Sequence, residues 1–118
     1  MEDYIIREID KIGDVLALIA SKLGLGTYAF PTDQLAVQMN TELVNDLDVD
    51  MYELLSKDNP LEYLVSEKGF SDRNLESLAV MMYQAVPTSD TLETFIKNTA
   101  AYLNQKGVFS FALHSVIN

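Results

Sequence analysis

Apolar residues recur at intervals of three and four along most of this 118-residue chain, and this spacing constrains its fold more than any other feature. In the first segment charged side chains separate the members of an apolar stripe, which are Ile5, Ile9, Ile12, Leu16, Ile19 and Leu23. A repeat near 3.6 residues is typical of an amphipathic helix with one buried face. The spacing therefore predicts a helix over residues 2–23, which Gly24 and Gly26 end.

The same spacing returns in the rest of the chain, and Pro, Gly and capping residues separate the segments. It predicts further helices at about 31–46, 51–55, 60–68, 71–86 and 91–106. We expect Asn59 and Ser71 to be N-caps, and Asp90 with Glu93 has the spacing of a capping box. Ser110 is a candidate cap for a last helix, although the aromatic and β-branched residues of 108–118 leave a strand as the alternative.

The length and composition indicate one globular domain spanning residues 1–118. A chain of this length supports a single hydrophobic core, and 48% hydrophobic with 22% charged residues is ordinary globular usage. Only five Gly and three Pro residues are present, which favours helices over many short strands. The inferred connections are short, so consecutive helices are expected to be antiparallel neighbours. The predicted fold is all-α, built of antiparallel helical hairpins, with about six or seven helices.

The charge excludes some classes of partner. The formal net charge is −10 and the isoelectric point is near 4.2, so phosphate backbones and anionic membrane surfaces are repelled. Charged residues interrupt the first stripe too often for a transmembrane span, and the acidic start MEDY is unlike a secretion signal. The chain has no cysteine, which fits a reducing compartment. We expect a cytoplasmic protein that binds neither nucleic acid nor membrane.

The known catalytic and metal-binding motifs are incomplete in this chain. Asp46, Asp48 and Asp50 begin like a calcium-binding loop, but Met51 and Lys57 replace the required glycine and glutamate. His114 is the single histidine, so no histidine cluster for a metal is possible. An enzyme that uses His114 or carboxylates is kept as an unfavoured alternative. We predict no cofactor, no metal site and no enzymatic activity.

The segment AAYLNQKGVFSFALHSV resembles the turn between the two helices of a tetratricopeptide (TPR) repeat. Ala100 and Ala112 occupy the positions of small residues that let two helices approach closely. Gly107 occupies the position of the turn, and Phe109 that of an aromatic residue. The resemblance implies a TPR-like helical array.

The whole chain is similar to a family of small bacterial all-helical proteins, with no assigned activity, that begin like MEDYIIREIDKIG and end in a degenerate TPR-like hairpin. The family resemblance implies the fold and no chemistry. The hairpin pattern, the acidic balance and the incomplete catalytic motifs favour a protein-interaction or adaptor module that binds a peptide or protein in a groove between helical hairpins. The candidate partner-binding residues lie on the expected concave side of helix 91–106, and they are Thr94, Lys97, Asn104 and Gln105.

The alternative to an adaptor is a self-associating structural subunit. Its dimer seam would be the stripe from Ile5 to Leu23, because alternation by four and three is the spacing of helix-to-helix seams. A second possibility for the same stripe is burial inside the domain. The sequence leaves both open, and with them a possible homodimer.

Overall fold

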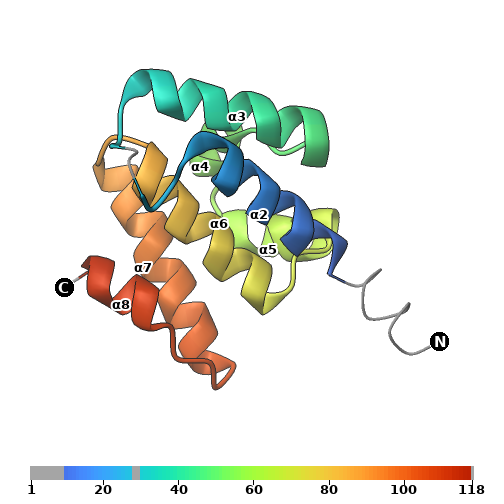
Figure 1. The fold of residues 1–118 in the computed structure, drawn as a ribbon. Helices are drawn as coiled ribbons and strands as arrows, with labels where there is room; N and C mark the ends of the chain where they lie inside the picture. The colour runs from blue at the N-terminus through green and yellow to red at the C-terminus, as the bar shows by residue number, and fades with distance from the viewer. Residues whose placement is uncertain (1–9, 28–29, 118) are drawn as a thin grey trace.

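The computed structural model describes residues 10–27 and 30–117, and every regular element in this part of the chain is an α-helix (Figure 1). The helices are α2 (Lys11–Leu23), α3 (Asp33–Leu47), α4 (Met51–Ser56), α5 (Pro60–Lys68), α6 (Asp72–Ala85), α7 (Asp90–Gln105) and α8 (Phe111–Ile117). The all-α prediction is confirmed, and the last segment is a helix rather than a strand.

Short polar side chains cap the N-termini of several of these helices. They accept hydrogen bonds from backbone N–H groups that have no partner inside the helix. The hydroxyl of Thr32 accepts a hydrogen bond from Leu35 N–H at 3.0 Å. At the start of α6, Ser71 and Asn74 form a reciprocal capping box. Ser110 caps α8, as predicted, by accepting from the backbone N–H three residues on.

Two predicted helix starts need correction. The N-cap of α7 is Ser89 rather than Asp90, because the Ser89 hydroxyl accepts from the backbone N–H three residues on and Asp90 is already helical. Pro31 precedes the N-cap of α3 and lies outside its first turn. Of the helix predicted over 2–23, residues 2–9 lie outside the described residues.

The helices pack as hairpins around α6 (Figure 1). Two hairpins, α2–α3 and α6–α7, lie side by side, with α2 and α3 both against α6. Helix α8 packs on both α6 and α7, whereas the short helices α4 and α5 contact each other and α4 contacts α7. Thr32 N–H donates to the Ala85 carbonyl at 3.3 Å, so the chain that follows α2 meets the end of α6. Helices α2 and α6 therefore run in the same direction.

Helix α6 supplies the centre of the core. Its buried residues are Asn74, Leu75, Leu78, Ala79, Met81, Met82 and Ala85. At helical spacing they occupy one broad face of the helix, and α2, α3, α7 and α8 all pack against α6. Full burial of one such leucine side chain contributes about 1.5–3 kcal/mol.

The apolar stripe of α2 is used inside the domain. Leu16 and Ile19 are 1% and 2% exposed, and Ile12 and Leu23 are partly buried against the same core. Ile5 and Ile9, the first two members of the predicted seam, lie outside the described residues. Leu16 and Ile19 are therefore buried inside the domain and are not accessible to a partner helix.

Candidate functional site

A groove of about 320 Å³ lies where α2, α6 and α8 meet, and we call it the α2/α6/α8 groove. Its lining residues are Gly13, Leu16, Ala17, Ala20, Glu76, Ser77, Val80, Met81, Gln84 and Ala112. Leu16 and Met81 also belong to the buried core, so the floor of the groove is continuous with it. The surface inside the groove is therefore mainly apolar, as in most ligand-binding clefts.

Small side chains keep this groove open. On α2 the lining positions Gly13, Ala17 and Ala20 are spaced by four and three, which places them along one face of the helix. Ser77 and Ala112 contribute similarly short side chains from α6 and α8. Larger residues at these positions would fill the space between the helices. The groove thus results from side-chain size at a few helical positions on a rigid scaffold.

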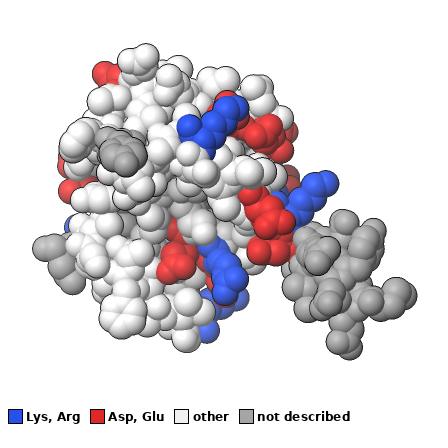
Figure 2. Space-filling view, viewed as in Figure 1, with Lys and Arg blue, Asp and Glu red and all other residues white. Residues whose placement is uncertain are grey.

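The charge at the groove is negative. Glu76 is the one ionisable side chain among the lining residues. Asp10, the residue before α2, lies close by, because a Cβ atom on Gly13 would come within 2.5 Å of its Oδ1 atom. Figure 2 shows the face that carries α2: acidic and basic atoms are scattered over it, and uncharged surface lies between them. A ligand with apolar side chains and a positive charge is the best match to this lining.

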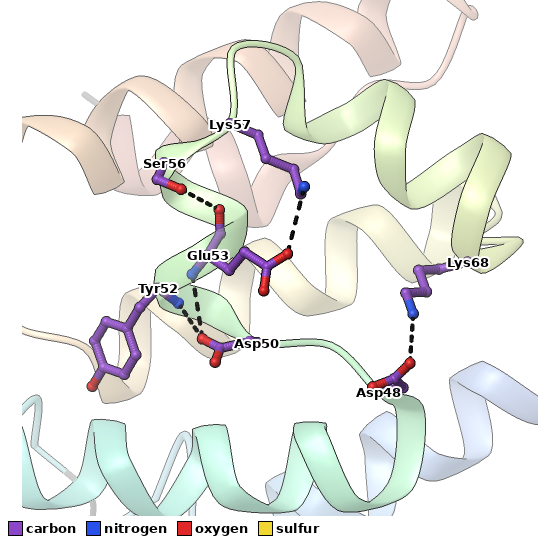
Figure 3. A network of polar contacts seen from close by, with 7 residues as sticks. All are labelled: Asp48, Asp50, Tyr52, Glu53, Ser56, Lys57 and Lys68. Carbon is purple, nitrogen blue, oxygen red and sulfur yellow. Dashed lines mark hydrogen bonds and ion pairs between the residues drawn. The ribbon is translucent and has the colours of Figure 1, made fainter.

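A second hollow, of about 280 Å³, contains a network of charged side chains around α4 (Figure 3). Asp50 caps α4 by accepting from the backbone N–H groups of Tyr52 and Glu53. Lys68 at the end of α5 pairs with Asp48 at 3.1 Å, and Lys57 pairs with Glu53 at 3.6 Å.

The two lysines of this hollow also lie over the ring of Tyr63. The Nζ atoms of Lys57 and Lys68 are 4.2 Å and 5.8 Å from its centroid, within or near the range of cation–π attraction. Each ammonium group therefore already has a carboxylate and an aromatic partner within the chain. We interpret the network as a clasp that holds α4 and α5 to the end of α3.

The clasp makes folding stability depend on pH in the alkaline range. The hydrogen bond from Lys68 to Asp48 raises the pKa of Lys68 above its ordinary value of 10.5, with smaller contributions from Tyr63. Because the pKa of Lys68 is higher in the folded state than in the unfolded state, its protonated form stabilises the fold. This contribution is complete below the unfolded-state pKa and is lost as pH rises through the folded-state pKa.

We expect the stability difference between the wild type and Lys68→Met to be constant up to about pH 10 and to shrink above it, because deprotonation then removes the ion pair in the wild type as well. Urea denaturation of both proteins across that range measures the difference. Since Asp48 is largely exposed, the effect is small, within the range of about 0–1 kcal/mol typical of surface ion pairs. A difference that does not change with pH would contradict the clasp.

The structure places the predicted partner-binding residues on the outward face of α7. Thr94, Lys97, Asn104 and Gln105 are all exposed, but α7 contributes no lining residue to the α2/α6/α8 groove. Thr94 borders a hollow shared with α4 and α5, and Lys97 borders a different one shared with α6 and α8. Asn104 instead faces His114, with Nδ2 and Nε2 3.5 Å apart. The groove between hairpins lies on the other side of α6.

His114, the candidate for an enzymatic role, lies in an aromatic setting. Its ring stacks on Phe109 with centroids 4.4 Å apart. The neighbouring serine hydroxyls bind backbone groups: Ser110 Oγ accepts from Leu113 N–H, and Ser115 Oγ donates to the Phe111 carbonyl. Among residues 10–27 and 30–117, no group of three or more acidic or histidine side chains is placed to hold a metal ion.

Sequence reasoning missed the groove residues, although a signal for them was present. A second stripe, of small residues, runs along α2 beside the apolar one and consists of Gly13, Ala17 and Ala20. Small residues at helical spacing mark a face where a neighbouring helix approaches closely or where space remains. Whether a neighbouring helix packs closely on this face or leaves space depends on which helix lies opposite it. That helix is α6, which begins at Asp72, far along the chain from the end of α2 at Leu23.

Comparison of the chain with protein-family models, with curated proteins and with solved structures gave no match. In the described part of the chain, no helix has both the length and the apolar character needed to cross a bilayer.

Proposed function

We propose that this chain is a protein-interaction module that binds a segment of a partner protein in the α2/α6/α8 groove. The single observation that carries the proposal is a mainly apolar groove of about 320 Å³ whose floor is the rigid core and whose walls come from three helices. Sites that recognise helical or extended peptides commonly have this form.

The packing order supports a TPR-like array as the framework of this groove. In such an array the first helix of each repeat contacts both helices of the preceding repeat, and the first helices line one face. Here α6 contacts α2 and α3, and α8 contacts α6 and α7. With α2, α6 and α8 as the first helices, α4 and α5 are an insertion, and the groove lies on the face that the first helices share.

The preferred ligand follows from the lining. The walls admit aliphatic side chains of moderate size, because Gly13, Ala17, Ala20 and Ala112 leave limited but open space between helices. Glu76 and the nearby Asp10 favour a lysine or arginine beside them, in a chain whose net charge is already −10. We therefore infer a segment that combines two or more aliphatic residues with at least one basic residue.

A peptide selection tests this function and does not require an identified partner. Random peptides displayed on phage are selected for binding to the wild-type chain, and individual binders are then measured against Ala17→Trp. Ala17 is exposed in the middle of α2, so the indole fills the groove without entering the core. We expect Ala17→Trp to weaken the binding of selected peptides by at least about tenfold, which corresponds to about 1.4 kcal/mol.

The matched control is Ala101→Trp, the same substitution at an exposed alanine in the middle of α7 that does not line the groove. It should leave peptide affinity unchanged. A second variant, Glu76→Gln, should reduce binding of those peptides that contain lysine or arginine. If Ala17→Trp and Ala101→Trp bind the selected peptides equally well, the groove is not the binding site.

A further inference from the structure

The two adjacent methionines of α6 have different places in the fold. Met81 lines the α2/α6/α8 groove and is 5% exposed, whereas Met82 is fully buried and does not line it. Successive residues of a helix point about 100° apart, so the two side chains leave α6 in different directions. Met82 therefore belongs to the core alone, while Met81 lies at the boundary between the core and the groove.

Met81 and Leu16 form the deepest part of the groove. They are the two buried residues among those that line it, and the other lining residues are half-buried or exposed. Leu16 comes from α2 and Met81 from α6, and both belong to the core cluster. An apolar ligand side chain that inserts between α2 and α6 thus ends on these two residues. We call such a side chain the anchor of the ligand.

Met81 is also the one long and flexible apolar side chain in the lining. Five lining residues have side chains too short to reshape the groove by rotation, and these are Gly13, Ala17, Ala20, Ser77 and Ala112. Val80 is branched at Cβ, which restricts its rotamers, and Leu16 is held in the core at 1% exposure. A methionine has three rotatable bonds and a polarizable sulfur atom, so it adapts to its neighbours. The shape of the apolar floor therefore depends on Met81.

We propose that Met81 determines which anchor the groove accepts, and that the ligands are segments anchored by one leucine, isoleucine or methionine. This inference rests on the proposed function. Rotation of the Met81 side chain accommodates aliphatic anchors of similar volume with similar affinity. A large aromatic anchor would need Met81 to retreat into the core, which is closely packed and has little space to receive it. The groove therefore discriminates against tryptophan as an anchor.

A double-mutant cycle between the chain and one peptide tests this role of Met81. The tightest peptide from the phage selection is scanned with alanine, and the apolar position with the largest loss of affinity is its anchor. Peptides with leucine or tryptophan at that position are then titrated against the wild type and Met81→Ala. We expect the wild type to prefer the leucine peptide by at least about tenfold, and this preference to fall by at least about tenfold in Met81→Ala.

Two further variants keep the test independent of general effects on folding. Met81→Val removes less volume than Met81→Ala, so it should lower the leucine preference in the same direction by a smaller factor. Met82→Ala is the matched control, because it opens a cavity in the same turn of α6 at a side chain that does not line the groove. It should leave the preference unchanged. Circular dichroism checks that the helix content of all three variants matches that of the wild type.

The outcomes separate this inference from the proposed function. If Ala17→Trp blocks peptide binding but both Met81 variants keep the wild-type preference, the role of Met81 is wrong and the groove remains the binding site. An equal fall of the preference in Met82→Ala also overturns the role, since it would result from a looser core. A wild type that binds the tryptophan peptide as tightly as the leucine peptide overturns it as well. If Ala17→Trp leaves binding intact, the groove is not the site and both proposals fail.

Discussion

Replacing Leu16 by aspartate is expected to unfold the domain. The Leu16 side chain is 1% exposed and belongs to the core between α2 and its neighbours. An ionised carboxylate at this position would lose its hydration without gaining a partner, a change that costs at least about 4 kcal/mol. A domain of this size has a total stability of about 5–15 kcal/mol, so much of it is removed. Urea denaturation followed by circular dichroism measures the loss.

The control for this prediction lies two residues further along the same helix. Leu18 is 70% exposed, so Leu18→Asp should change the free energy of unfolding by no more than about 0.5 kcal/mol. The pair also separates the two interpretations of the apolar stripe. If Leu16 lay only in a seam between folded monomers, Leu16→Asp would dissociate the protein and leave its helix content intact. A folded, monomeric Leu16→Asp variant would therefore contradict the packing of α2 described above.

The second large effect is expected at Leu78 in the centre of α6. Leu78 is fully buried, and α6 is in contact with α2, α3, α7 and α8, so few side chains can move to fill a gap there. Leu78→Ala should lower the free energy of unfolding by about 2–5 kcal/mol, through lost apolar burial and the cavity that remains. Urea denaturation measures the loss. If the slope of the unfolding free energy against urea concentration is unchanged, the substitution has altered stability alone.

A volume-conserving substitution gives the matched control. Leu78→Met keeps most of the side-chain volume and should cost less than about 1.5 kcal/mol. Similar losses for Leu78→Ala and Leu78→Met would mean that shape at this position matters more than volume. A small loss for Leu78→Ala would mean that α6 is not the centre of the core.

Local sequence signals predicted the helices well. The apolar spacing in α6 and α7 and the caps Ser71 and Ser110 all involve residues within one or two turns of each other, so the sequence contains both partners of each interaction. The N-cap of α7 was misplaced by one residue because Ser89 and Asp90 are both good capping residues. Which of them caps depends on where the chain leaves the preceding loop.

The candidate groove could not be predicted from the same signals. Its walls come from α2, α6 and α8, which are distant in sequence, and its existence depends on the parallel arrangement of α2 and α6. The sequence-based choice of α7 assumed that the last two helices form one repeat, with α7 on the concave side. The exposure of Thr94 and Lys97 was compatible with that assumption, because an outward face and a groove face have the same polar pattern.

The parallel course of α2 and α6 has a consequence for the order in which the chain folds. Contacts of α6 with α7 and of α7 with α8 close loops of only a few residues, whereas the pairing of α2 with α6 must close a loop of roughly fifty residues at a larger entropic cost. We therefore expect the C-terminal three helices to form first and the α2–α3 hairpin to dock on them afterwards. Because α2 is one wall of the groove, the groove would then be completed only by this last step, and a ligand bound there would hold the hairpin in place.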